Sequence, residues 1–433
     1  MNYEQKRQKI VQYIKKGEKS PDEFTLGLEL EHFVTDKNTH ETIGYFGDES
    51  VSDILNLLKD KYDFKAHEEN GHVLSLHKGN YDIATEPAAQ FEVAINSKRC
   101  IKELEDDYKK LMEILIPILD SKNLNLTTLG YHPKSKIDDI KILPKKRYEH
   151  MYNYFQKHGA KFAHNMMKGT ASMQVTIDFE NETDFKKKYF VANALSPFIY
   201  STFDNAYIFE SKKYEYRNLR QTIWQHCDRQ RTGVYPFSFD DNLSYEKYAD
   251  HILNTDIIFV NENGEDIYKG DVKFKDLIKD EMDDELIFHA LSIVFPDVRV
   301  KRYIEIRMAD EVNYPLNFSY VAFTKGIFYN QSSLDEVYEI LKDMDIYALE
   351  NLKSRAEKDS IKAKYKEKTI RDHMLKFCEI AKKGLDDKEK EYLDSLIKML
   401  QNYETPRDIF EKLYEKSPSK AIDEFSVKGN FNG

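Results

Sequence analysis

The chain has 433 residues, of which 41% are hydrophobic and 33% are charged, and its net charge is −11. The apolar content is sufficient for a sizeable core, and the acidic balance argues against nucleic acid or an anionic membrane as the main partner. Its three scattered cysteines fit neither a disulfide framework nor a zinc site, and the charged N-terminal segment has no apolar signal region. We therefore expect a cytoplasmic protein that does not span a membrane.

In chain order, the spacing of apolar residues predicts helices and strands that are interspersed up to about residue 310, and mostly helices beyond it. The predicted elements are a helix at 3–16, a strand at 24–34, a helix at 49–61, strands at 72–77 and 81–95, a helix at 97–121, a strand at 124–130, a helix at 146–157, a strand at 173–179, helices at 182–205, 245–254 and 285–293, a strand at 298–310, a helix at 318–329, and further helices beyond 333.

The strand predicted at 298–310 has one apolar and one charged face, because side chains alternate sides along a strand. Apart from Arg302, one parity is apolar: Val298, Val300, Ile304, Ile306 and Met308. The other parity is polar or charged: Arg299, Lys301, Tyr303, Glu305 and Arg307.

Three other strands repeat this design. Their polar faces carry Glu29 with Glu31, Glu86 with Glu92, and Gln174. Each pair taken alone is ordinary for a half-solvated strand, and Arg307 alone would be an ordinary salt-bridge partner. Four strands with one pattern instead predict a shared polar face.

The carboxylates of that face form a candidate metal site: Glu29, Glu31, Glu86, Glu92 and Glu305. Carboxylates crowded in one concavity need cations, and oxygen ligands suit hard ions such as Mg²⁺ or Mn²⁺, which often share their shell with substrate phosphates. Arg307, beside Glu305, suits a phosphoryl group in transfer. The chain has no glycine-rich phosphate loop and no dinucleotide turn, so a nucleotide site here has to rely on carboxylates and metal.

The stretch 220–233 is rich in arginine and contains the only tryptophan, Trp224. Arg220, Asp228 and Arg231 lie within it, and guanidinium groups bind a substrate carboxylate through two hydrogen bonds. Tryptophan is more often a core residue than a ligand platform. As a group, these residues predict the substrate-binding end of the site.

Five ordered motifs resemble the glutamate–cysteine ligases of the plant and proteobacterial type over nearly the whole chain. They are Leu26-Gly-Leu-Glu-Leu-Glu-His-Phe33, Thr85-Glu-Pro-Ala-Ala-Gln-Phe-Glu92, Met173-Gln-Val-Thr-Ile-Asp-Phe179, the stretch 220–233 followed by Pro236-Phe-Ser-Phe-Asp-Asp241, and Phe295-Pro-Asp-Val-Arg-Val-Lys-Arg-Tyr-Ile-Glu-Ile-Arg307.

The resemblance implies an α+β, glutamine-synthetase-like fold, with a curved antiparallel sheet that forms a funnel flanked by helices. We expect a catalytic core at 1–330 and a helical C-terminal region at 331–433, in a monomer or homodimer. The implied reaction uses ATP and magnesium to form γ-glutamyl phosphate, from which the cysteine amine displaces phosphate. The resemblance also implies that the five glutamates hold metal, with Glu305 and Arg307 as the catalytic pair, and that Arg220, Trp224, Arg231, Gln174 and Asp228 bind substrate.

Two departures from the family pattern keep alternatives open. Ala88 and Ala89 replace two glycines, and Met308 replaces another. The same chemistry with a different amine acceptor or carboxylate donor is one alternative. The other is a protein without catalytic activity that binds a metal ion or a nucleotide.

Overall fold

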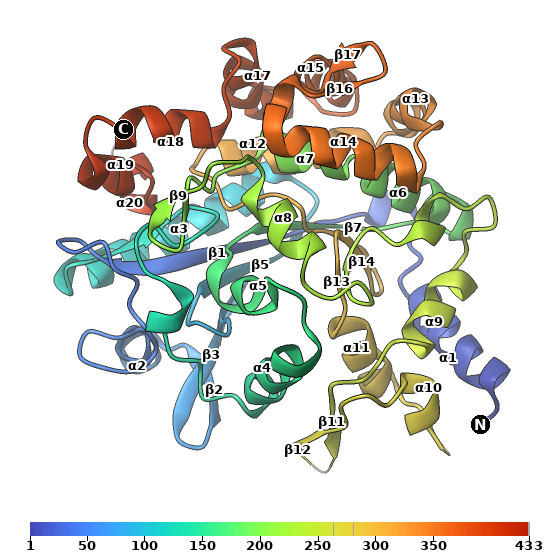
Figure 1. Ribbon diagram of the computed structural model, residues 1–433, viewed down its shortest axis with the longest axis horizontal. Helices are drawn as coiled ribbons and strands as arrows, with labels where there is room; N and C mark the ends of the chain where they lie inside the picture. Colours follow the sequence, from blue (N-terminus) through green and yellow to red (C-terminus); the bar gives the residue numbers. More distant parts are fainter. Residues whose placement is uncertain (263, 280, 432–433) are drawn as a thin grey trace.

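The computed structural model describes residues 1–262, 264–279 and 281–431 (Figure 1). Its centre is a nine-stranded sheet in which all neighbouring strands are antiparallel. The strand order is β14 (Val298–Val300), β15 (Ile304–Ile306), β7 (Met173–Ile177), β1 (Leu26–Asp36), β5 (Phe91–Lys98), β4 (Tyr81–Thr85), β3 (His72–Lys78) and β2 (Lys65–Glu69), while β6 (Leu124–Thr127) pairs with the end of β1.

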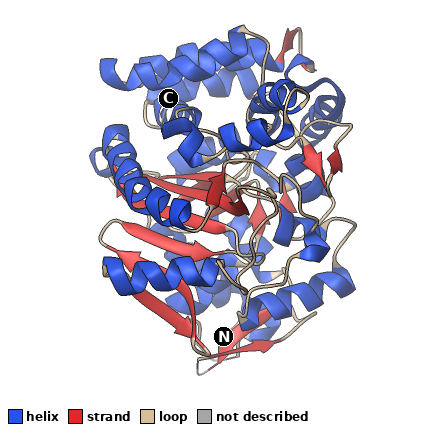
Figure 2. Ribbon diagram, turned by 90° about the vertical axis from the view of Figure 1, so that its left-hand side faces the viewer, coloured by secondary structure: helices blue, strands red, loops and turns tan. Residues whose placement is uncertain are grey.

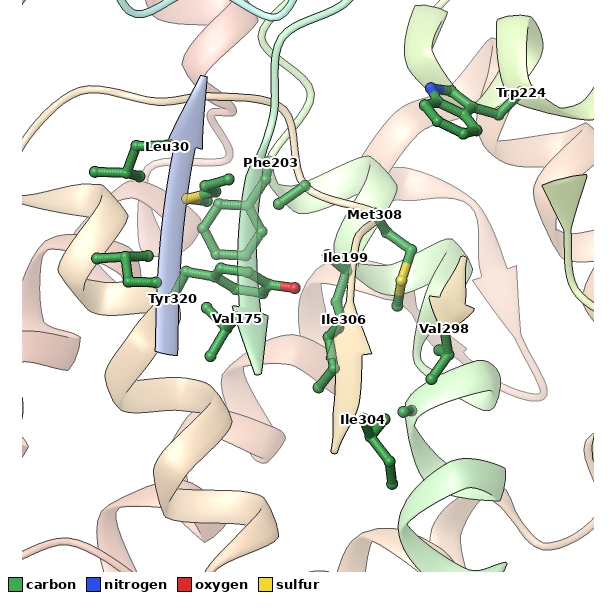
Figure 3. Packing of buried hydrophobic residues seen from close by; sticks show 14 of the residues in the cluster. Leu30, Val175, Ile199, Phe203, Trp224, Val298, Ile304, Ile306, Met308 and Tyr320 are labelled. Atoms are coloured by element: carbon green, nitrogen blue, oxygen red, sulfur yellow. The ribbon is translucent and has the colours of Figure 1, made fainter. Parts of the chain in front are cut away.

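The apolar face of the sheet packs against buried helices. Leu30 and Val175 on the central strands, and Ile306 on β15, lie close to Tyr320 of α12 (Leu316–Phe328) and to Ile199 of α7 (Ser196–Thr202), as Figure 3 shows. Helix α12 is buried on nearly all sides, which suits its almost uncharged sequence. Because side chains alternate, the opposite face of the same strands carries the predicted polar residues.

The remaining helices surround this sheet (Figure 2). Before α12 they are α1 (Tyr3–Lys15), α2 (Val51–Tyr62), α3 (Ile101–Ser121), α4 (Lys146–His158), α5 (Ala163–Gly169), α6 (Glu182–Ala194), α8 (Leu219–Gln225), α9 (Tyr245–Leu253), α10 (Phe274–Leu277) and α11 (Asp284–Ser292). Short strand pairs are β8 (Ile208–Phe209) with β9 (Lys212–Lys213), β10 (Thr232–Gly233) with β13 (Phe295–Pro296), and β11 (Phe259–Glu262) with β12 (Glu265–Tyr268).

The C-terminal part is helical, and its orange and red helices lie along one side of the molecule in Figure 1. They are α13 (Gln331–Leu341), α14 (Ile346–Asp359), α15 (Ile370–Lys383), α16 (Asp387–Lys390), α17 (Asp394–Gln401), α18 (Pro406–Tyr414), α19 (Pro418–Glu424) and α20 (Val427–Phe431), with the strand pair β16 (Lys364–Tyr365) and β17 (Lys368–Thr369). The predicted α+β class, with an antiparallel sheet and a helical C-terminal part, is confirmed. The division at 330/331 stays a prediction, and residues 432–433 of the predicted C-terminal region lie outside the described residues.

Two predicted strands are in fact hairpins. The strand predicted at 298–310 folds back at residues 301–303, so that Arg299 pairs with Glu305 across β14 and β15. The strand predicted at 81–95 turns at residues 86–90, where the Ala89 N–H donates to the Glu86 carbonyl at 2.8 Å. Ala89 adopts a φ of +62° in this tight turn. Within the described part of the chain, no helix is long and apolar enough to cross a membrane.

Candidate active site

A cavity of about 350 Å³ opens on the polar face of the sheet. Four carboxylates from the predicted metal site line it: Glu29, Glu31, Glu86 and Glu92. Four cationic side chains line it as well: Arg147, Arg299, Lys301 and Arg307. The structure therefore brings residues from four separate sequence regions to one charged cavity.

The register of the sheet sets the acidic side of the cavity. On β1, Glu31 lies directly opposite Glu92 of β5, and Glu29 lies opposite Gln174 of β7. Glu86 is in the turn between β4 and β5, where the Tyr148 hydroxyl donates to its Oε1 at 3.4 Å. Like charges directly opposite on neighbouring strands are destabilising unless a cation lies between them.

Burial and the charge of neighbouring carboxylates raise the pKa of Glu29, Glu31 and Glu92. Burial raises the pKa of Glu31 to about 7, against the opposing effect of Arg220. The pKa of Glu29 is raised by burial and by the charge of Glu305, and that of Glu92 by burial and by Glu29. Their surroundings thus disfavour the charged form of these three carboxyl groups.

The predicted carboxylate ligands suit a hard metal ion chemically, but their side chains do not converge on one point. Buried carboxylates that raise one another's pKa are stabilised by a cation, and their oxygens suit Mg²⁺ or Mn²⁺. However, within the described residues no three His, Cys, Asp or Glu side chains are arranged closely enough to hold a metal ion. The five predicted ligands thus share one region of the sheet, and their role as ligands stays a prediction.

Glu305 contacts the cationic residues of the cavity from below its surface, and Glu305 itself is not among the described residues that line the cavity. Its buried carboxylate pairs with Arg299, with Lys301 at 2.9 Å and with Arg307 at 3.4 Å. Burial alone would raise the pKa of Glu305, but these three cations lower it well below its usual range. The sequence pattern placed Arg299 and Lys301 on the same face, although we did not predict them as site residues.

Arg307 is held from several sides. Its Nη1 donates to the side-chain oxygen of Gln174, whose amide in turn donates to Glu31 Oε1 at 3.0 Å. Its backbone carbonyl accepts a hydrogen bond of 3.1 Å from Arg220 Nη2. Gln174 and Arg307 both line the cavity, so they connect its acidic and cationic sides.

The predicted substrate-binding residues divide into two groups. Trp224 of α8 lines the cavity, and the Arg220 guanidinium lies 4.8 Å from the centre of its ring. Arg231 and Asp228, which follow this helix in the chain, pair with each other at 2.8 Å, and neither is among the described residues that line the cavity. Arg231 is fully buried against Tyr154.

Sequence reasoning missed the walls of the cavity. One wall consists of methionines from α4 and α5, and the other carries aromatic residues from β11, α11 and β13: Met151, Met166, Met167, Phe259, Phe288, His289 and Phe295. The spacing of these residues in the sequence indicates only amphipathic helices and short strands, and it does not reveal that they line a cavity.

The departures from the family pattern are next to residues that line the cavity but are not themselves among the described lining residues. Met308 is fully buried beside Val298 and Ile199 on the apolar face of the sheet (Figure 3). Ala88 and Ala89 are buried in the β4–β5 turn, and neither is among the described lining residues. The extra methyl and thioether groups therefore do not form part of the described cavity wall.

Fold and cavity together define a class of protein, an α+β protein with a carboxylate-and-cation site on an antiparallel sheet. The model of glutamate–cysteine ligase family 2 matches residues 25–411, and the chain belongs to this family. Curated relatives include glutamate–cysteine ligase A, chloroplastic, of Oryza sativa subsp. indica, with 28% identity over 96% of this chain and 86% of the relative. The glutamate–cysteine ligase, chloroplastic, of Arabidopsis thaliana is 26% identical over 96% of this chain and 81% of its own length.

A solved structure has the same fold. The glutamate–cysteine ligase of Francisella tularensis in complex with AMP matches 93% of this chain and 88% of its own, with a TM-score of 0.55 and 12% sequence identity. The resemblance found in the sequence motifs is thus confirmed, and the chain is an enzyme of the ligase class.

Proposed function

We propose that this enzyme joins the γ-carboxylate of glutamate to the amine of cysteine, using ATP and a γ-glutamyl phosphate intermediate. Family membership supports the reaction class. The observation that carries the proposal is that Arg307 faces the same cavity as the carboxylates of β1 and β5. Magnesium or manganese would be held by the glutamates that line the cavity, Glu29, Glu31, Glu86 and Glu92, and would neutralise the phosphate oxygens. Glu305 would act through Arg307, with which it is paired.

The side chains of the chain itself have distinct roles in this reaction. Arg307 stabilises the negative charge on the phosphoryl group as it moves from ATP to the γ-carboxylate. Gln174 orients Arg307 through their hydrogen bond. Arg220 and Trp224 form the end of the site that binds the amino-acid substrate. The buried guanidinium of Arg220 has two nitrogens, Nε and Nη1, without a hydrogen-bond partner among the described residues, so both can donate to a substrate carboxylate. Asp228 and Arg231 support this end of the site through their own ion pair, without lining the cavity.

The alternatives receive less support. A different acceptor or donor was motivated by Ala88, Ala89 and Met308, all of which lie outside the cavity lining. A protein without catalysis would not need Glu305 and Arg307 together, and here both are retained and in contact. The predicted cytoplasmic location stays a prediction, and the plant relatives are named as chloroplastic. The monomer or homodimer state also stays a prediction.

The direct test is phosphate release from ATP and Mg²⁺ with glutamate alone, then with glutamate and cysteine. We expect release that depends on both amino acids, together with a product of the mass of γ-glutamylcysteine. Release that proceeds equally well without cysteine would reject the proposed acceptor. Phosphate release with a panel of other amines would then identify the amine that the enzyme accepts.

A further inference from the structure

A buried ion pair joins the C-terminal helical part to the cavity side of the molecule. Lys353 of α14 lies 2.7 Å from Asp297, the residue between β13 and β14, and both side chains are 1% exposed. The carboxylate of Asp297 also accepts hydrogen bonds from the hydroxyls of Ser196 and, at 2.9 Å, of Tyr200. None of these side chains is among the described residues that line the cavity. Buried ion pairs contribute little to stability on average, so stability alone does not account for this one.

The backbone of Asp297 connects this pair to Arg307. The Arg307 N–H donates to the Asp297 carbonyl at 3.0 Å, and the Asp297 N–H donates to the Gly233 carbonyl at 2.9 Å. Arg307 directly follows β15, so this hydrogen bond sets where its side chain enters the cavity. Asp297 is therefore held by its side chain from α7 and α14, while its backbone holds Arg307.

The backbone of Lys353 connects the same pair to α8. Its carbonyl accepts a hydrogen bond of 3.2 Å from Gln221 Nε2, and Gln221 is adjacent to Arg220. Two more bonds join these helices, Thr222 to Glu357 at 3.2 Å and Gln225 to Glu350 at 3.0 Å. Because Arg220 Nη2 donates to the Arg307 carbonyl, the connections form a closed ring through α14, Asp297, Arg307 and α8.

We propose that Lys353 and Asp297 are positioning residues that hold Arg307 and α8 at a fixed separation across the cavity. Helix α14 thereby contributes to catalysis from outside the site, without touching a substrate. This inference rests on the proposed function, in which Arg307 acts on the phosphoryl group and α8 on the amino acid. Precise placement of the two groups is what turnover requires.

The main test is Lys353→Met, which keeps the length of the side chain and removes its charge. We expect turnover to fall by about 10²-fold, the size of effect that a displacement of about 1 Å causes, while KM for both amino acids changes little. Trp224, the only tryptophan, lies on α8 in the cavity wall. We therefore also expect its fluorescence emission to shift in the variant, independently of any activity.

Two further variants separate positioning from stability. Lys353→Met with Asp297→Asn leaves no unpaired buried charge, so it should regain thermal stability relative to the single variant while its turnover stays low. If the single variant does not fold, this double variant alone carries the test. The control is Lys325→Met, which breaks a partly buried pair with Glu389 at 2.6 Å between α12 and α16 and should change neither turnover nor Trp224 emission.

Turnover that recovers along with stability in the double variant, or an equal loss in Lys325→Met, would overturn the proposal. So would unchanged Trp224 emission in a folded Lys353→Met protein. Failure of the proposed function is recognised separately, because it affects the wild-type enzyme. In that case the wild type shows no cysteine-dependent release, whereas the comparison of variants is still made through Trp224 emission and through turnover of whichever amine is accepted.

Discussion

Arg307 is the residue on which the proposed chemistry depends most. We expect Arg307→Ala to lower turnover by about 10² to 10³-fold, the effect of removing one group that stabilises transition-state charge. The measurement is ADP formation under saturating substrates. Arg302→Ala is a matched control, because Arg302 lies in the turn of the same hairpin and pairs with Asp284 at the surface. Near-normal turnover of Arg307→Ala would remove Arg307 from the mechanism.

His132 makes the stability of the enzyme sensitive to acid. Its Nε2 lies 2.7 Å from the Lys168 carbonyl and therefore donates, so Nδ1 accepts from the Thr42 hydroxyl at 2.9 Å. Burial lowers the pKa of His132 from 6.5 to about 4. The unfolded chain thus binds the proton more tightly, and the stabilisation present above pH 6.5 is lost as the pH falls towards 4.

We expect this residue to account for a loss of about 2 kcal/mol in unfolding free energy between pH 7.5 and pH 5. His132→Gln removes the titration, so its unfolding free energy should fall less over that range. Buried groups that titrate in both proteins, such as His32, cancel in the comparison. Equal pH dependence of the two proteins in urea titrations would contradict this assignment.

At the residue scale, the sequence predicted most of the charged cavity because alternation assigns side chains to faces. Glu29, Glu31, Gln174 and Arg307 were found in this way. Alternation does not specify how deep a residue lies, so it could not distinguish Glu305, which is covered by three cations, from the residues that line the cavity. The same limit applies to Arg231, whose nearest charged partner is three residues away in sequence.

The hairpin of β14 and β15 shows why its turn was missed. Residues 301–303 contain no glycine, proline, asparagine or aspartate, which are the usual signals of a turn. A connection of three residues also preserves parity, because Val300 and Ile304 pair directly and lie on one face. The alternating pattern of a single long strand and that of this hairpin are therefore identical.

The β4–β5 turn yields a prediction about stability. Ala89 has a φ of +62°, a conformation that costs an L-residue about 1–2 kcal/mol and costs glycine little. We expect Ala89→Gly to raise the unfolding free energy by about 1 kcal/mol, after the entropy that glycine adds to the unfolded chain. The measurement is the midpoint of urea unfolding, with turnover unchanged because Ala89 lies outside the cavity lining.

Ala88→Gly is the matched control, since it removes the same methyl group one residue earlier. Ala88 is fully buried and is not among the residues with positive φ, so glycine should lower the unfolding free energy there. Changes of the same sign in both variants would show that backbone conformation is not the cause.

At the scale of the whole molecule, the walls of the cavity were the least predictable feature. Met166 on α5 and Phe288 on α11 line one cavity only because of how separate helices pack. Their distance in the chain leaves no local pattern to detect. The strands were accessible through their period of two, and the helical C-terminal part through its period of 3.6. The antiparallel arrangement of the strands came from the resemblance of the motifs to a known family.

The position of β1 in the sheet has a consequence for biosynthesis. This strand pairs with β5 on one side and with β7 on the other, and β7 needs β15 as its second neighbour. On a ribosome, β1 remains an open edge until residue 177 has emerged, and β7 remains one until residue 306. Pairings this distant in the chain form slowly, and open edges invite mispairing. The hairpin that brings Arg307 also closes the last of these edges, so a nascent chain acquires its protected sheet and the arginine of the proposed phosphoryl site in the same step.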